Sequence, residues 1–488
     1  MSNLRTLLKQ SSHYVTGRTG VLLLGFVSFP VFTRIFTVAQ YGTLSLVLKL
    51  LGLATILGKA GLQQSVLRFH QEHTVSGEQG RTQQFYSSII FGVLMVSTLV
   101  AAIFFAGVSV MPESLVTANF KQPMRWGSIY IVIKASEAIL WAFLRVEERT
   151  KLYNSLDIGI KAGTIALVSW ILFHVETSVR AFVVGITLIE GVAVLGVCLL
   201  QISRGRLSPR AFRSDVFRTA FWFGMPLIGY EFAGMILDSG DRIMVEHFLG
   251  PQMLGYYSAA YNICTYIEEA LMVPMGLALV PMYMKIWVGE GKEATSKFLE
   301  QALNTYVLAA ALVASGAIVC ARDLVILLGS RKLQESAQLL PMLVIGLLAY
   351  ATYHFMNAGL LIHKKTGVML RIVASASVLN IAINLVLIPR MQLQGAALAT
   401  LISYLFLVSS LARASFRYLP LRINWVLWMK YVAAAAISGF AAAQIHFGVI
   451  LINLAIKGCV IVLLYGLMLC AFDRQIRERV MLLRASRG

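Results

Sequence analysis

The sequence predicts an all-α polytopic membrane protein with about fourteen transmembrane helices. Three observations support this fold class: 58% of the residues are hydrophobic, only 13% are charged, and the mean hydropathy is +0.74. A chain of 488 residues has room for many spans of about 20 residues each. No gap between the apolar runs is long enough for a soluble domain of ordinary size.

Apolar runs of about 18–25 residues define the expected spans in chain order. They are residues 15–36, 42–66, 85–111, 123–144, 152–173, 180–202, 216–238, 253–284, 302–321, 338–362, 367–388, 394–412, 426–446 and 449–471.

An internal repeat divides these spans into two halves. A shift of 213 residues aligns residues 35–45 with 248–258, including Gly42 with Gly255. Both segments link a span that leaves the membrane to one that re-enters it. The repeat predicts a six-helix bundle at 1–212, a pseudo-equivalent bundle at 213–425, and two further helices with a basic cytoplasmic tail at 426–488. Such repeats are typical of transporters whose site lies between the halves.

The charge pattern excludes a nucleic-acid partner and predicts the orientation. Lys and Arg number 42 against 23 Asp and Glu, but they are scattered between apolar spans and form no basic patch. They concentrate in alternate connecting segments, such as 204–213, which places both termini in the cytoplasm. The arginines of 204–213 are typical of a topology determinant.

Cysteine and histidine usage indicates neither a metal site nor an enzyme. The five cysteines lie inside predicted spans without paired spacing. The histidines are isolated, and no loop is large enough for the catalytic machinery of a polytopic glycosyltransferase. We therefore expect no catalytic residue, no bound metal and no cofactor.

Acidic residues interrupt the apolar stretch from Phe221 to Tyr283, which we expect to form helices at 216–238 and 253–284 with an external loop between them. Ionisable groups near a bilayer centre cost about 2.5–3.5 kcal/mol each, so they face water or a partner, or lie at a helix end. The candidates for ion coupling, by a proton or by Na⁺, are Glu231, Asp238, Glu268 and Glu269. A salt bridge to a cation on another helix is the alternative for each.

Three segments resemble one transporter family: PVFTRIFTVAQYG at the end of the first helix, GMPLIGYEFAGMILDSGDRIMVEHFLG leading into GYYSAAY, and RDLVILLGSRKLQESAQLLPMLVIGLLAY. Their order is similar to that of the Wzx-type polysaccharide-export flippases of the multidrug/oligosaccharidyl-lipid/polysaccharide exporter superfamily. The resemblance covers essentially the whole chain. It implies two six-helix bundles about a central cavity that opens alternately inward and outward, and a cargo linked to a polyprenyl pyrophosphate. The last two helices fit the fourteen-helix members.

A pyrophosphate cargo requires cations in the cavity. Lys49 and Lys59 lie on one polar stripe with Gly52 and Gln63 and have no opposite charge at helical spacing on their own segment, so they are the leading candidates. The further candidates are Arg18, Arg34, Lys134 and Lys161.

Alternatives remain open for several of these residues. Lys134 with Glu137, and Asp157 with Lys161, could instead be intrahelical ion pairs. Arg34 could extend to the lipid head groups. Tyr261 is a candidate for glycan contact, whereas Tyr256 and Tyr257 are typical of an interfacial belt.

The interpretation is a multi-pass protein of the bacterial plasma membrane that flips a polyprenyl-pyrophosphate-linked oligosaccharide from the cytoplasmic to the outer leaflet by alternating access. The expected partners are this lipid-linked cargo, membrane lipids, and a polysaccharide polymerase and glycosyltransferases; a monomer suffices. Three alternatives stay open: a cation-coupled small-molecule antiporter, a peptidoglycan-precursor (lipid II) flippase, and a non-transporting scaffold of a polysaccharide-assembly complex. An antiporter of cationic drugs would need an acidic cavity.

Overall fold

The computed structural model describes residues 2–74, 79–112 and 118–472, and this part of the chain contains helices and no strand. The all-α prediction is therefore confirmed for these residues. The basic tail expected after residue 472 lies outside them.

The chain divides into two compact units, Met1–Gly255 (unit 1) and Tyr256–Gly488 (unit 2). The expected bundle boundaries after residues 212 and 425 stay predictions. The helices before the boundary are α1 (Ser2–Ile35), α2 (Val38–Lys59), α3 (Leu62–Thr74), α4 (Gln79–Val110), α5 (Ala118–Val146), α6 (Thr150–Gly163), the π-helical turn η1 (Thr164–Val168), α7 (Ser169–His174), α8 (Val179–Ser203) and the 3-10 turn η2 (Pro209–Ala211). Helix α9 (Ser214–Glu290) contains the boundary.

Unit 2 continues with a second series of helices. They are α10 (Lys292–Val319), α11 (Ala321–Leu324), the π-helical turn η3 (Val325–Gly329), the 3-10 helix η4 (Arg331–Leu339), α12 (Leu340–Ala351), α13 (Tyr353–Met356), α14 (Ala358–Ile362), α15 (Thr366–Ser415), α16 (Trp425–Ala443) and α17 (Ile450–Phe472).

Ten helical segments of the described residues are long and apolar enough to cross a membrane. Two of them, Ser214–Met272 and Thr366–Ser415, have 59 and 50 residues. At about 1.5 Å per residue each is more than twice the roughly 30 Å of a bilayer core. Each also contains one non-helical residue, Gly250 or Gln392, so each accommodates two spans. The protein is a multi-pass membrane protein.

Several expected boundaries were wrong. The external loop expected between 238 and 253 is helical except at Gly250, whose φ is 81°. The expected span 42–66 breaks at Ala60 and Gly61, which both have positive φ. The expected span 338–362 consists of three short helices, and the expected loop 322–337 is largely helical.

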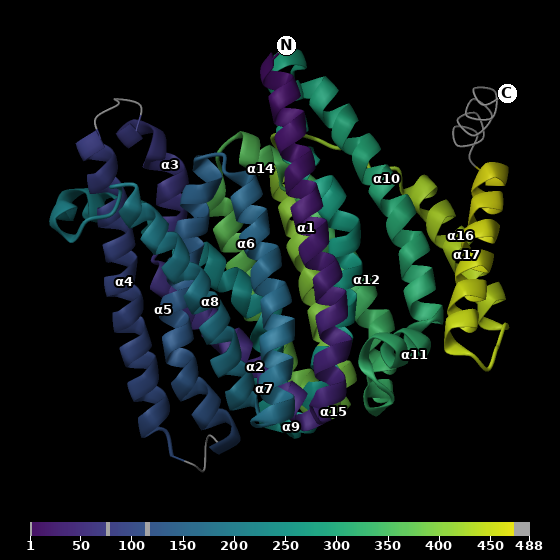
Figure 1. The fold of residues 1–488 in the computed structure, drawn as a ribbon. Coiled ribbons are helices and arrows are strands. Elements are labelled where there is room, and N and C mark those ends of the chain that lie inside the picture. Colours follow the sequence, from purple (N-terminus) through teal and green to yellow (C-terminus); the bar gives the residue numbers. More distant parts are fainter. Residues whose placement is uncertain (1, 75–78, 113–117, 473–488) are drawn as a thin grey trace. The chain divides into compact units, whose positions relative to one another are not determined.

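In unit 1, α5 packs against α2, α4 and α8 around an apolar core (Figure 1). The core includes Phe85 and Tyr86 of α4, and Ile139 and Phe143 of α5. Helix α2 begins with a capping box, in which Thr37 Oγ1 accepts from the Gln40 backbone and the Gln40 side chain accepts from the Thr37 backbone. This start positions the polar stripe of α2.

The connecting segments at one end of unit 1 meet at Glu147. Its carboxylate accepts a hydrogen bond from Tyr86 (2.5 Å) and pairs with Arg149 (2.8 Å) and Arg206 (2.7 Å). The Arg206 guanidinium also lies 5.5 Å from the centre of the Tyr86 ring. The basic segment 204–213 is thus fixed by ion pairing to the protein, in addition to any role in topology.

In unit 2, the last two helices, α16 and α17, pack against each other and against α10 (Figure 1). Ser315 Oγ of α10 donates to the Ala435 carbonyl at 2.7 Å, and Trp428 Nε1 donates to Asn304 Oδ1 at 2.8 Å. Asn453 of α17 donates to the Asp323 carboxylate of α11 at 2.5 Å. Polar contacts therefore attach the additional helices to the rest of the unit.

Candidate functional site

Two lysines of α2 form ion pairs with two carboxylates of α9 within unit 1. Lys49 Nζ lies 2.6 Å from Asp238 Oδ2, and Lys59 Nζ lies 2.7 Å from Glu231 Oε2. The Lys49 and Asp238 side chains are 30% and 38% exposed, and those of Lys59 and Glu231 are 15% and 29% exposed. Each ammonium group is paired with a carboxylate, and the side chain that carries it remains partly exposed. We refer to these as the α2–α9 ion pairs.

Glycines allow α2 and α9 to approach closely enough for these pairs. A Cβ atom on Gly52 would lie 2.9 Å from the terminal methyl carbon of Met235, and one on Gly61 would lie 2.2 Å from the Gly224 carbonyl oxygen. Gly61 also has a φ of +67°, which favours glycine. Small residues commonly bring membrane helices into backbone contact. The lysine stripe therefore faces α9 because the glycines beside it leave room.

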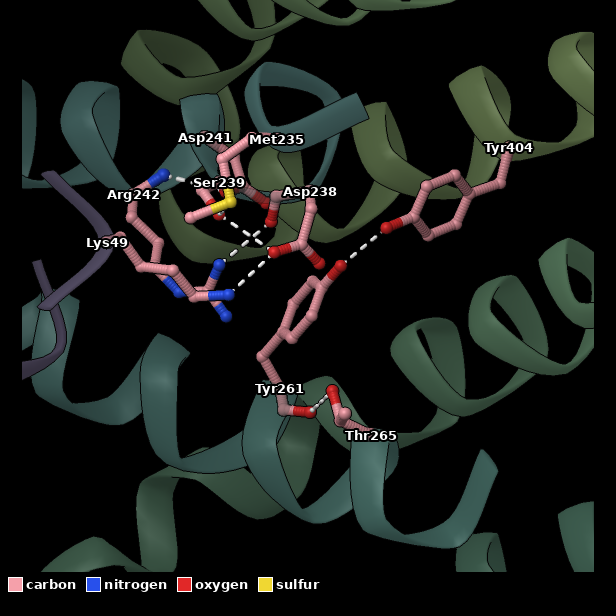
Figure 2. Close-up of polar contacts among 9 residues, drawn as sticks. All are labelled: Lys49, Met235, Asp238, Ser239, Asp241, Arg242, Tyr261, Thr265 and Tyr404. Atoms are coloured by element: carbon pink, nitrogen blue, oxygen red, sulfur yellow. Dashed lines mark hydrogen bonds and ion pairs between the residues drawn. The ribbon is translucent and has the colours of Figure 1, made fainter. Parts of the chain in front are cut away.

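The surroundings of Asp238 explain why α9 stays helical through a polar sequence (Figure 2). Ser239 Oγ donates to the Asp238 carboxylate at 2.8 Å, and Arg242 Nη1 donates to the Asp238 backbone carbonyl at 2.8 Å. The Arg242 backbone N–H donates to Asp241 Oδ1 at 2.7 Å. Asp241 and Arg242 are fully buried. They thus lie inside α9, within the stretch that was expected to be an external loop.

Among the other expected cations, Arg34 is exposed and donates to the Pro30 carbonyl at 3.0 Å. The side chain of Arg18 lies outside the described residues. Lys161 is half-buried on α6. The carboxylate of Asp157 accepts from Trp141 Nε1 at 2.8 Å, and the expected pairing of Asp157 with Lys161 stays a prediction.

Lys134 forms the ion pair with Glu137 that the spacing predicts, at 2.7 Å, so this interpretation is confirmed. A second acid, Glu190 of α8, lies 3.1 Å from the same ammonium group. Sequence reasoning missed Glu190. The available signal was a single carboxylate in the otherwise apolar span 180–202.

In unit 2, Tyr261 is buried and shares a hydrogen bond with Tyr404 of α15, and its backbone carbonyl accepts from Thr265 at 3.0 Å (Figure 2). Tyr257 is also buried, with its hydroxyl 3.2 Å from Thr400 Oγ1. Its expected place in an interfacial belt was wrong, because a polar partner inside the unit takes its hydroxyl. Glu268 and Glu269 are half-buried on α9.

Unit 2 also contains an apolar cavity of about 860 Å³ among α10, α12, α15 and α16. Its lining includes Ala311 of α10, Ile345 of α12, Val408 of α15, and Ala436 of α16. Most lining side chains are aliphatic or aromatic, so the cavity suits an apolar chain and not a charged group.

The described residues contain no group of three or more His, Cys, Asp or Glu side chains arranged to hold a metal ion. The candidate site in unit 1 offers lysine ammonium groups paired with carboxylates. Such a set can exchange one anion for another at an ammonium group, or exchange protons at the carboxylates.

The fold and this site define a polytopic all-α membrane protein with lysine–carboxylate pairs between two of its helices. The structure is similar to the lipid II flippase MurJ in an inward closed conformation (TM-score 0.74, 14% identity, covering 95% of this chain and 99% of that chain). It is also similar to the eukaryotic MATE transporter AtDTX14 (TM-score 0.59, 12% identity, 88% and 99% covered) and to the Vibrio cholerae MATE transporter VcmN in its bent form (TM-score 0.52, 15% identity, 90% and 99% covered). The resemblance inferred from the sequence to this exporter superfamily is thus confirmed at the level of the fold.

The sequence profile of the family described as "Polysaccharide biosynthesis protein" matches residues 7–287, and the chain belongs to this family. A relative, the succinoglycan biosynthesis transport protein ExoT of Rhizobium meliloti (strain 1021), is 20% identical over 315 residues. That match covers 63% of this chain and 60% of the length of the relative.

Proposed function

We propose that this protein is a flippase that moves a polyprenyl-pyrophosphate-linked oligosaccharide from the cytoplasmic to the outer leaflet by alternating access. Membership of the polysaccharide biosynthesis family and the flippase fold support this proposal. The protein would act in the bacterial plasma membrane with both termini in the cytoplasm. It would work as a monomer beside a polysaccharide polymerase and glycosyltransferases.

The observation that carries the proposal is the pair of partly exposed lysine side chains on α2. A pyrophosphate oxygen can replace a carboxylate oxygen at an ammonium group, because both are anionic acceptors of charge-assisted hydrogen bonds. Asp238 and Glu231 thus act as resident anions that keep Lys49 and Lys59 in place until cargo arrives.

The two ammonium groups would serve the pyrophosphate in succession. Lys49 and Lys59 lie ten residues apart on one helix, which corresponds to about 15 Å along its axis. A pyrophosphate is shorter than this distance, so it would contact one lysine and then the other along the translocation path. The apolar cavity of unit 2 supports the same cargo, since it offers a place for part of the polyprenyl chain.

The experiment is a flipping assay in liposomes with a fluorescent polyprenyl-pyrophosphate oligosaccharide. The test variant is K49Q/K59Q/E231Q/D238N, which removes both cations without leaving their carboxylates unpaired. Lys151→Gln on the exposed start of α6 is the matched control. We expect flipping by the wild type and the control and none by the test variant, with equal yields of folded protein.

Full flipping by the test variant would reject the role of the two lysines. A wild type that flips no lipid-linked sugar would reject the flippase itself. The same liposomes loaded with a cationic dye test the antiporter, and a labelled peptidoglycan precursor tests the other flippase class.

A further inference from the structure

Near the midpoints of α5 and α8, one ammonium group is shared by two carboxylates. Lys134 Nζ lies 2.7 Å from Glu137 Oε2 and 3.1 Å from Glu190 Oε2. The Tyr130 hydroxyl donates to the other oxygen of Glu190 at 3.3 Å. We refer to these four residues as the Lys134 cluster.

The Lys134 cluster is buried on its acidic side. The side chains of Glu137 and Glu190 are each 9% exposed, whereas that of Lys134 is 36% exposed. Helix α5 contacts α2, α3, α4, α6 and α8, yet in the described residues the ion pairs that Glu137 and Glu190 form within 4 Å are both with Lys134. No further cation of the described residues therefore balances the second carboxylate.

The charges of the cluster do not cancel. With both carboxylates ionised and Lys134 protonated, the cluster carries a net charge of −1 inside a membrane-spanning bundle, which is strongly disfavoured. Glu137 and Glu190 both lie against the same ammonium group, so two like charges are held close together when both are ionised. A proton on one of the two carboxylates removes this repulsion and brings the net charge of the cluster to zero.

A proton suits this site better than a metal ion. The Lys134 ammonium group already occupies the position between the carboxylates that a metal would need. The remaining polar group is the Tyr130 hydroxyl, which donates its proton to Glu190 and so offers no strong ligand. Sodium would have to displace a fixed cation, whereas a proton requires no additional space.

We propose that Glu137 and Glu190 bind one exchangeable proton between them, with Lys134 as their fixed counterion. In this role Lys134 serves the proton site and not the pyrophosphate. Loss of the proton would leave a net negative charge, which favours a conformation that admits water along the exposed Lys134 side chain. Coupling of this step to transport rests on the proposed flippase function, but proton binding does not.

Proton binding is tested on the purified full-length protein in lipid nanodiscs by infrared spectroscopy with isotope-labelled glutamate. We expect the wild type to have a protonated glutamic acid band that disappears as the pH rises. Glu137→Gln and Glu190→Gln should each lose the band. In each variant the charge of the remaining carboxylate is neutralised by the Lys134 ammonium group, so no proton is required. Lys134→Gln should approximately double it. Glu176→Gln, an exposed acid paired with Arg180, is the control and should leave the band unchanged.

A wild-type spectrum with no protonated glutamate at any pH would overturn the proposal without the need for a variant. A band unchanged in both single glutamate variants that fold would also overturn it. A Na⁺-dependent rise in Tm that Glu190→Gln abolishes would overturn the proposal, because it would show that this site binds sodium and not a proton.

Coupling has its own readout in the liposome assay. We expect an imposed pH gradient to accelerate flipping several-fold in the wild type and in Glu176→Gln but not in Glu190→Gln. A wild type that flips equally fast with and without the gradient would refute coupling while the flippase stands. Absence of flipping in every variant, with the infrared titration intact, would refute the flippase while the proton site stands.

Discussion

The backbone of Gly255 lies directly against Gly42, the residue with which the internal repeat aligns it. A Cβ atom on Gly42 would lie 2.2 Å from the Pro251 carbonyl oxygen and 2.6 Å from the Gly255 nitrogen. A Cβ atom on Gly255 would lie 2.1 Å from the Val38 carbonyl oxygen. Both positions therefore require glycine, because each faces the backbone of the other segment.

Gly42→Ala should destabilise unit 1. The added methyl group forces backbone to move, and overpacking of this kind costs about 1–3 kcal/mol. Thermal unfolding in detergent measures the effect as a lower Tm. Gly107→Ala is the control, since a Cβ atom there would meet nothing within 4 Å. Equal Tm values for the two variants would show that the close approach of Gly42 is not required.

The α2–α9 ion pairs should contribute to stability as well as to cargo binding. Lys59→Gln leaves Glu231 unpaired, so it should cost more than the roughly 1 kcal/mol of an exposed pair and less than the roughly 3–5 kcal/mol of a fully buried pair. Adding Glu231→Gln should recover most of that loss. A double-mutant cycle by chemical unfolding measures the coupling, with the exposed pair Arg68–Glu72 as the control. Strict additivity at Lys59 and Glu231 would contradict this prediction.

Hydropathy was sufficient to predict the class of fold and most spans, but not where helices break. The sequence Asp238, Asp241, Arg242 and Glu246 is typical of an exit from the membrane. In the structure the first three of these are held by contacts within unit 1, so α9 remains helical as far as Gly250. These three contacts lie within α9 itself, whereas the ion pair of Asp238 with Lys49 spans 189 residues and could not be predicted from the local sequence.

For the candidate site, too, local spacing could be read from the sequence but partners on other helices could not. Spacing along α2 was enough to place Lys49 and Lys59 on one stripe, and the spacing of Lys134 and Glu137 predicted their pairing. The partners Asp238 and Glu231 could not be assigned, because helix–helix contacts across 189 and 172 residues have no local signature. Glu190 lies on a different helix from Lys134 and could not be assigned either.

Glu147→Gln should be among the most destabilising single substitutions at its end of unit 1. The carboxylate is 7% exposed and pairs with both Arg149 and Arg206, so the amide would leave two cations without their anion. Breaking a buried ion pair costs about 3–5 kcal/mol. Limited proteolysis of segment 204–213 should quicken, and Tm should fall. Glu72→Gln, at an exposed pair, should change Tm by far less. Similar Tm values for both variants would show that the Glu147 contacts are not required for stability.

Filling the apolar cavity of unit 2 should impair the transport of long-tailed cargo. Ala436 of α16 lines the cavity, and Ala433, one turn earlier on the same helix, is also exposed but is not part of the lining. A tryptophan at 436 that displaces two methylene groups of the polyprenyl chain would weaken binding by about 1.6 kcal/mol, or about fifteenfold. Flipping of a long-chain cargo should fall in Ala436→Trp and stay near the wild-type rate in Ala433→Trp. A cargo with a short prenyl chain should be flipped equally by both, since its tail need not enter the cavity. Equal loss for long and short chains in Ala436→Trp would show that the tryptophan disturbs the helices themselves and that the cavity does not hold the tail.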